Sequence, residues 1–508
     1  MTNDSDFESK AGSIPPQTRG TVVARRIRNW AARQLPSWID TANTKQSRAY
    51  YREKDVERIP ASIPSSNQNV SLKQVFAAEF YTPAHAEQLF SGFKKLGWDS
   101  ARTSPFRTSS EEWATRSRKN SGGMWLNLGT IVPPGSKQNR GVATSELPEG
   151  FSAARAEFLS VSPSLSCIIV TFESTSQMEA RYEEIARSSV GTRLLRIERG
   201  HSITPPGENK RRMIAESREG FRSDILKWFK SNLPGAFSAS GNLELFPTGE
   251  LLFVDGFRNG DEKVPSLWRN YLGLDYGTGH WESSNVAGLM FAHPVSHDEN
   301  QKGHSVIYAE RSELRRTENA LFGGDGDEAY LNRLSIELPG FVGHWGLSAL
   351  LRLYQEELSV VRDGSSSARS VDAATAIERL QRVTSNSIDI SLFSAELPDA
   401  FPFMLWSNCD FTTQQDGMES ISLAAASRQS SMDLLERLGK SDRAIRDLLV
   451  QQGNLISAME GVRTQRNMSK LTVIMTALTV VILLLTALMA VPVVFPKAFQ
   501  ADITSESE

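Results

Sequence analysis

The chain has 508 residues, of which 40% are hydrophobic and 23% are charged. This composition excludes a wholly disordered chain, a collagen-like repeat and a disulfide scaffold, and the length suggests about three domains. The 56 basic residues nearly balance the 59 acidic residues, for a formal net charge of −3, so charge gives no reason to expect a nucleic-acid partner. The two cysteines, Cys167 and Cys409, lie far apart in the sequence, which fits a reducing compartment.

Residues 1–67 are predicted to form an irregular leader. Within it, residues 19–35 carry five arginines and no acid, with Val23, Ile27 and Trp30 at helical spacing. A basic amphipathic helix of this kind can lie on an anionic membrane surface. The alternatives are a helix that docks on the folded domain and a solvated arm.

Residues 68–410 are predicted to form a mixed α/β soluble domain, or two domains with a boundary near residue 205. Strand patterns and helix patterns alternate along it, so the fold class is α+β or α/β. The predicted strands are 73–81, 124–132, 154–162, 165–174, 193–200, 287–294 and 305–311, and the segment 243–257 is predicted to be a hairpin with its turn at Pro247-Thr248-Gly249. The predicted helices are 84–98, 177–188, 213–233, 344–361 and 372–382.

Residues 411–470 are predicted to form a helical stalk, because apolar residues follow alternating steps of three and four. This spacing is typical of a coiled coil, and it favours a homo-oligomer. The alternative is one amphipathic helix packed on its own domain, and Gly439, Gly453 and Gly461 weaken the coiled-coil pattern. The apolar seam consists of Leu434, Leu438, Ile445, Leu448, Leu455, Met459 and Val462.

Residues 471–495 are predicted to be a single transmembrane helix, followed by a short tail over 496–508. The run from Leu471 to Val491 has no charge, and about 20 apolar residues suffice to cross a bilayer. Arg463, Arg466 and Lys470 precede the span, whereas only Lys497 follows it. This asymmetry predicts that the N-terminal domain is cytoplasmic and the tail is outside.

Four threonines form one stripe along the predicted span. Their hydroxyl groups can bond to a neighbouring helix, which favours a stripe that faces other copies of the chain. The alternative is that each hydroxyl bonds to the carbonyl four residues earlier in its own helix. The stripe consists of Thr472, Thr476, Thr479 and Thr486.

Two short segments are candidates for chemistry. His293, His297 and His304 lie close together in the sequence and could hold a divalent metal ion, although Pro294 favours a loop between two strands. Residues 273–282 resemble the first glycine-rich motif of class I S-adenosylmethionine-dependent methyltransferases. That resemblance would place the cofactor against Asp275, Gly277 and Gly279, while a plain glycine-rich turn is the alternative.

The arrangement of stalk and span over about 430–490 resembles CorA-type divalent-cation transporters. Asn467 to Thr472 is similar to the entry into that family's first span. Neither the Gly-Met-Asn that follows that span in the family nor a second hydrophobic segment is found. The resemblance therefore implies an oligomer with the stalk near its axis, and it does not imply magnesium transport.

Together these patterns predict a single-pass membrane protein whose large cytoplasmic domain senses a small ligand or recruits a protein partner. No cofactor and no catalytic residue is predicted, so an enzymatic activity is not favoured. Two alternatives stay open: a transport or channel-like assembly of several spans, and a membrane-anchored enzyme.

Overall fold

The computed structural model describes most of the predicted domain and the whole length of the C-terminal helix. The described residues are 42–60, 63–99, 108–119, 124–136, 142–197, 200–256, 270–274, 279–293, 303–316, 326–367, 388–400, 411–413 and 421–494. The basic segment 19–35 and the predicted helix 372–382 lie outside them.

An eleven-stranded mixed sheet forms the framework of the fold, in the order β13-β12-β9-β10-β11-β8-β1-β5-β4-β2-β3. Most neighbouring strands are antiparallel, while β8 pairs with β11, and β2 with β3, in parallel. A separate hairpin joins β6 and β7. The strands are β1 (Asn69–Tyr81), β2 (Met124–Val132), β3 (Val142–Thr144), β4 (Phe151–Ser162), β5 (Leu165–Ser174), β6 (Arg193–Ile197), β7 (Gly200–Thr204), β8 (Thr248–Asp255), β9 (Gly279–Ser283), β10 (Leu289–His293), β11 (His304–Glu310), β12 (Phe411–Thr413) and β13 (Ile421–Ser422).

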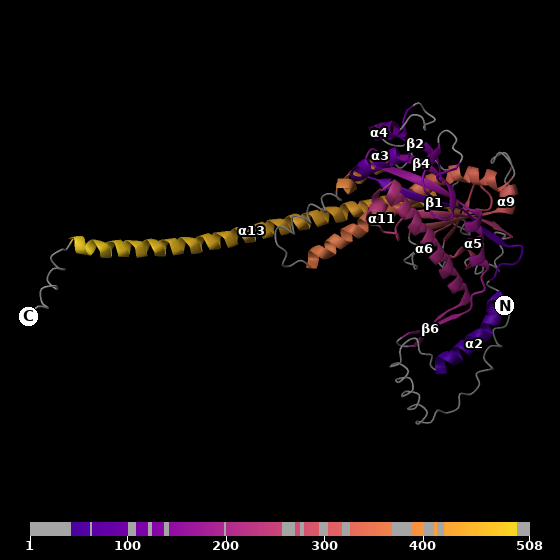
Figure 1. Cartoon of the computed structure of the whole chain (residues 1–508), viewed down its shortest axis with the longest axis horizontal. Helices are drawn as coiled ribbons and strands as arrows, with labels where there is room; N and C mark the ends of the chain where they lie inside the picture. Colours follow the sequence, from indigo (N-terminus) through magenta and orange to yellow (C-terminus); the bar gives the residue numbers. More distant parts are fainter. Residues whose placement is uncertain are drawn as a thin grey trace, which may run out of the picture. The chain divides into compact units, whose positions relative to one another are not determined.

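Helices cover both faces of the central strands (Figure 1). On one face, Tyr81 donates a hydrogen bond to the carbonyl that ends α6, and Lys73 pairs with Glu179 of α5. On the opposite face, α11 packs against Ala78 and Phe80. The helices are α2 (Ala42–Arg58), η2 (Pro83–His85), α3 (Ala86–Lys95), α4 (Ser110–Lys119), α5 (Ser176–Arg187), α6 (Pro206–Asn232), α7 (Ala236–Ser240), α9 (Arg311–Arg316), α11 (Asp327–Ser367) and α13 (Leu423–Val494). The mixed α/β class predicted from the sequence is thereby confirmed.

The centre of the sheet explains why the strand patterns were recognisable. β5 is buried from Leu165 to Phe172, and β1 is buried from Phe76 to Tyr81, because helices cover both faces there. Continuous apolar runs are typical of strands that are buried on both sides. The Pro205-Pro206 pair begins α6, since proline is well suited to the first turn of a helix.

The hairpin predicted over 243–257 is wrong, because Thr248–Asp255 is one uninterrupted strand. Gly249 lies inside that strand and not in a turn. A Cβ at Gly249 would lie 2.6 Å from the hydroxyl oxygen of Ser305 on the neighbouring β11. A glycine is therefore required at residue 249 because two strands approach each other closely there. The sequence Pro247-Thr248-Gly249 is also typical of a turn, so this close approach was not predicted.

The chain divides into two compact units, and residues 351–395 with 433–508 make up the second. Its described part is helical and has its own apolar core, built from Leu353, Leu358, Ile390, Phe393, Leu435, Leu438 and Ile445. Tyr354 donates a hydrogen bond of 2.7 Å to the carboxylate of Asp389. Arg446 binds both Asp442 and Ser391, at 3.0 Å each.

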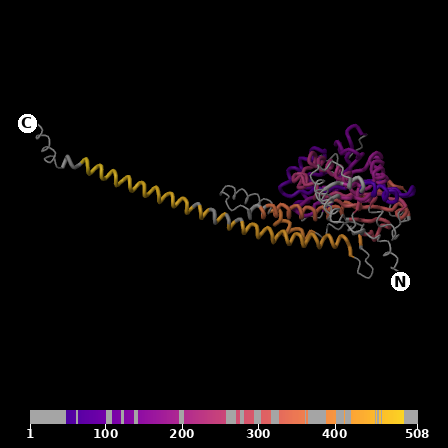
Figure 2. The backbone as a smooth tube through the Cα atoms, turned by 90° about the horizontal axis from the view of Figure 1, so that it is seen from below, coloured from indigo at the N-terminus to yellow at the C-terminus, as the bar shows by residue number. Residues whose placement is uncertain are grey.

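The helix α13 is continuous from Leu423 to Val494 (Figure 2). It begins later than the predicted stalk, since residues 411–413 and 421–422 are strands of the large sheet. Short edge strands of two or three residues carry too little periodicity to be distinguished from the start of a helix.

Candidate functional site

The residues of the glycine-rich motif do not lead into a helix. Asp275 and Gly277 lie outside the described residues. Gly279 is the first residue of strand β9, where it pairs with His293 at the end of β10. The turn-to-helix geometry that the cofactor motif uses is thus not found at Gly279.

The three histidines considered as metal ligands have different positions. His293 ends β10, His297 lies outside the described residues, and His304 begins β11. The strands β10 and β11 are antiparallel neighbours, and the residues between them, 294–302, lie outside the described part of the chain. Among the described residues, no group of three or more histidines, cysteines or acids is placed to hold a metal ion.

His304 belongs instead to a buried polar cluster around Arg218 of α6. The Nε atom of Arg218 donates to Glu250 at 3.0 Å, and its Nη1 atom donates to the carbonyl of Gly273 at 2.9 Å. Tyr182 donates to the same carboxylate at 3.2 Å. All four side chains of the polar cluster, those of Arg218, Glu250, Tyr182 and His304, are at most 2% exposed.

The charges of the polar cluster compensate one another. Burial alone would raise the pKa of Glu250, but Arg218 and His304 outweigh it and lower that pKa to about 2. Burial lowers the pKa of His304 to about 4, so its ring is neutral at pH 7. A buried carboxylate is tolerated where a cation and hydrogen bonds satisfy it, as Arg218 does here.

The tautomer of His304 follows from its two neighbours. Its Nε2 atom lies 3.5 Å from a carboxylate oxygen of Glu250, and its Nδ1 atom lies 2.9 Å from the hydroxyl of Thr248. Because two acceptors repel, the proton of the neutral ring is on Nε2 and faces Glu250. Nδ1 then accepts from Thr248, whose oxygen in turn accepts from Arg222 at 2.8 Å.

The polar cluster connects α6 to β8 and β11, and the burial of its members indicates a structural role. Arg222 also has a structural role, because it donates hydrogen bonds to the carbonyls of Leu243 and Phe246 at 2.6 and 3.0 Å. Sequence reasoning missed both arginines. The available signal was their spacing of four residues on the helix face that also carries Phe221 and Ile225.

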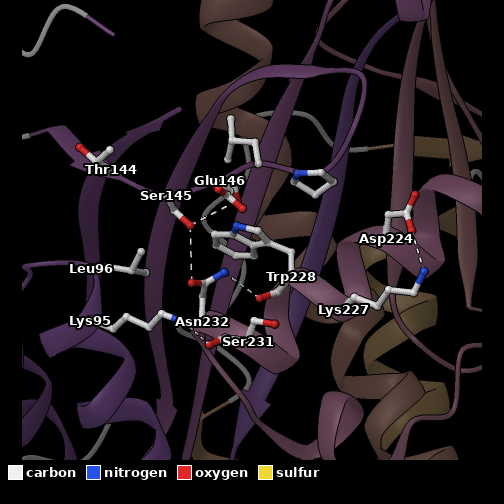
Figure 3. A pocket seen from close by; sticks show the side chains of 12 residues that line it. Lys95, Leu96, Thr144, Ser145, Glu146, Asp224, Lys227, Trp228, Ser231 and Asn232 are labelled. Carbon is white, nitrogen blue, oxygen red and sulfur yellow. Dashed lines mark hydrogen bonds and ion pairs between the residues drawn. The ribbon is translucent and has the colours of Figure 1, made fainter. Parts of the chain in front are cut away.

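One candidate for ligand binding is a pocket of about 470 Å³ beside the C-terminal ends of α3 and α6 (Figure 3). Asn232 is one of the most buried polar residues of its lining and is 7% exposed. The hydroxyl of Ser145 donates to the Asn232 amide oxygen at 3.5 Å. The pocket is lined by Lys95, Leu96, Thr144, Ser145, Glu146, Leu147, Pro148, Asp224, Lys227, Trp228, Ser231 and Asn232.

The cations at the pocket already have partners. Lys95 donates to the carbonyl of Ser231 at 2.7 Å, and Lys227 pairs with Asp224 at 2.9 Å. The two lysines of the lining are balanced by Glu146 and Asp224, so the wall offers hydroxyl and amide groups without a net charge. Such a lining suits a small polar ligand without a strong net charge.

A different feature of the described chain points to a membrane. One helix there is long and apolar enough to cross a bilayer, namely Ser457–Met489; its most apolar 18-residue stretch has a mean hydropathy of 2.6 and is not buried. The four threonines of the predicted stripe lie on it. Each of their hydroxyls donates to the carbonyl four residues earlier, at 2.7–2.9 Å.

The residues of the predicted stalk seam have two environments. Leu438 and Ile445 are at most 4% exposed, within the helical core of the second unit. Leu434 is half-buried. Leu448, Met459 and Val462 are 39%, 65% and 66% exposed, and the side chain of Leu455 lies outside the described part.

The sequence matches no protein-family model and no curated protein.

Proposed function

We propose that this chain is a single-pass membrane protein whose N-terminal domain lies in the cytoplasm and senses a small ligand or recruits a partner. The observation that carries the proposal is the continuity of α13, which runs without a break from the end of strand β13 through the uncharged run that begins at Leu471. A fully exposed apolar helix of this length is costly in water and stable in lipid.

The same proposal includes self-association through the lower stalk, which is the C-terminal part of the stalk with the exposed residues Leu448, Met459 and Val462. The resemblance to CorA-type transporters extends only to this arrangement of stalk and span. The pocket between Asn232, Ser145 and Lys95 is the proposed place for a small ligand, because it is an open cavity whose mixed lining includes hydroxyl and amide groups.

Membrane insertion and its direction are tested together by thiol labelling in intact cells. A single cysteine replaces Ser505 in the tail or Ser66 in the N-terminal part, in a chain with Cys167→Ser and Cys409→Ser. An impermeant reagent is expected to label the tail position and not Ser66. Labelling of Ser66 alone would reverse the proposed topology, and extraction of the protein by alkaline carbonate would contradict insertion.

Ligand sensing is tested by thermal-shift measurements on the purified full chain in detergent. The compounds are nucleotides, S-adenosylmethionine, neutral polar metabolites and divalent ions. A stabilising compound is expected to lose its effect in Ser231→Trp, which fills the pocket. Lys230→Trp is the matched control, because residue 230 is exposed on the same helix and does not line the pocket. Stabilisation that persists in Ser231→Trp would place the ligand elsewhere.

A further inference from the structure

The lower stalk carries an apolar seam and a group of basic residues on the same face of α13. If the heptad is written so that Leu448 and Val462 occupy position d, then Met459 occupies position a. Continuing that count places Arg463 at e, Arg466 at a and Lys470 at e. Positions a, d and e share one face of a helix. The basic group (Arg463, Arg466 and Lys470) therefore extends the exposed seam toward the membrane.

The upper part of the seam is already occupied within one copy. Leu438 and Ile445 are 1% and 4% exposed, whereas the next seam residue, Leu448, is 39% exposed. The seam itself does not end at that turn, because Met459 and Val462 continue it at 65% and 66% exposure. One packing interface thus continues into a stretch that the described chain leaves uncovered.

A second copy of this chain fits the uncovered stretch. Copies anchored in one membrane stand parallel and in the same register, so equivalent seam positions meet without further adjustment. Between Leu448 and Val462, positions e and g carry Leu449, Gln451, Ile456 and Ala458, none of which is charged. No like charges therefore oppose the pairing until the basic group is reached. Confinement to a membrane also raises the effective concentration of the copies.

In such an assembly, the basic groups of adjacent copies would face each other. Its three side chains are exposed, and they form no ion pair with any other described residue. No acidic residue occurs in the sequence from Val462 to Ala501. Two or more copies would bring at least six positive charges together beside the bilayer. Lys470 directly precedes the apolar run, and Arg463 stands about 10 Å above it, within about one Debye length.

Resting on the proposed function, we infer that the basic groups of adjoining copies form a binding site for anionic lipid headgroups. The headgroup phosphates and carboxylates neutralise the converging cations, and self-association and lipid binding therefore reinforce each other. One copy supplies three basic residues, while about four to eight characterise lipid-binding basic clusters. A second copy is what brings the number into that range.

The test uses the full chain in vesicles, with energy transfer between donor-labelled and acceptor-labelled copies as the readout. Vesicles of phosphatidylcholine are compared with vesicles that contain about 30 mol % phosphatidylserine, where a rise in transfer of at least about threefold is expected. Added salt should reduce that rise. Equal transfer in both vesicles would overturn the inference, as would an equal rise when inorganic phosphate is added to phosphatidylcholine vesicles.

Three variants make the test specific. Arg463→Gln/Arg466→Gln/Lys470→Gln is expected to associate more than the natural chain in neutral vesicles and to show no response to phosphatidylserine. Arg437→Gln/Lys440→Gln/Arg443→Gln removes the same charge further from the span and should respond like the natural chain. Met459→Asp should abolish transfer in both lipids. A lipid response in the first variant, its loss in the second, or transfer by Met459→Asp would contradict the inference.

Vesicle flotation separates this inference from the proposed anchor. If the natural chain does not float with vesicles of either composition, the membrane function itself is refuted. If the chain floats in both and transfer is insensitive to lipid charge, only the headgroup site is refuted.

Discussion

Gly346 of α11 lies directly against the ring of Phe80 on β1, so closely that a Cβ at residue 346 would stand 2.6 Å from the Cε2 atom of that ring. It would also stand 3.2 Å from the Cβ atom of Ala78. The long helix can therefore approach the centre of the sheet only where it lacks a side chain. Gly343 repeats the contact one turn earlier, against Leu159 and Ile169.

We expect Gly346→Ala to destabilise the domain by about 1–3 kcal/mol, because the added methyl group displaces either Phe80 or α11. Gly220→Ala is the matched control. Gly220 is exposed on α6 with no neighbour within 4 Å, so alanine there should stabilise by about 0.5–1 kcal/mol. Chemical unfolding followed by tryptophan fluorescence measures both. Equal effects of the two substitutions would contradict the close helix–sheet contact.

Arg218→Met should destabilise the domain by about 3–5 kcal/mol, because it leaves Glu250 buried without its cation. Arg212→Met on the same helix removes only an exposed pair with Glu216, whose side chain is 66% exposed, and should change stability by less than about 1 kcal/mol. The double variant Arg218→Met/Glu250→Leu should recover part of the loss, since no unpaired charge then remains. A loss as small as that of Arg212→Met would show that the polar cluster is not essential.

A pH dependence is expected from Glu157, which is 3% exposed and accepts a hydrogen bond of 2.8 Å from the indole of Trp125. Burial raises its pKa to about 7, although Trp125 and Arg155 oppose that shift. The folded state therefore holds this proton more tightly than the unfolded state, whose pKa is near 4.5. The resulting stability is complete below about pH 4.5 and is lost as the pH rises to about 7.

Glu157→Gln removes that dependence. The stability of the variant relative to the natural chain should thus increase between pH 4.5 and 7.5, by up to about 3 kcal/mol. Unfolding free energies at several pH values measure it, with the exposed Glu149→Gln as the control. A difference that stays constant with pH would show that the buried carboxyl does not titrate in this range.

Asp55 holds the N-terminal helix α2 to the domain. Its carboxylate accepts from the backbone N–H of Thr192 at 2.7 Å and from the Thr192 hydroxyl at 2.5 Å. Asp55→Ala is therefore expected to expose residues 42–60 to limited proteolysis at least several-fold faster, while the sheet core stays protected. Glu53→Ala, at an exposed position on the same helix, should leave the cleavage rate unchanged.

The sequence predicted the elements that have one environment along their whole length, because their apolar and polar residues then follow a regular pattern. β2 and β5 have the predicted bounds, and α5 differs by one residue at each end. The candidate membrane span was recognisable because every position in it is apolar or weakly polar. In contrast, β12 and β13 together contribute five residues to the sheet, and β9, the strand with which β12 pairs, is distant in sequence. No local pattern contains that pairing.

The polar cluster was not predictable for a related reason. Arg218 appears in the sequence as one basic residue of a charged helix, and only the fold brings it to Glu250, His304 and the carbonyl of Gly273. The histidines illustrate the converse. Their closeness in sequence suggested metal binding. The strand pairing instead places His304 inside the sheet, where its ring contacts Thr248 and Glu250.

The direct junction of β13 and α13 has a mechanical consequence. Ser422 is the last residue of the edge strand and Leu423 is the first of the long helix, so no slack separates the sheet from the helix that carries the candidate membrane span. Among the described residues, two pairs attach the edge strand to β12, Thr412 with Ser422 and Thr413 with Ile421. A helix transmits tension and torque along its axis, and a pull or twist that reaches Leu423 therefore loads these two pairs before any other pair of the sheet.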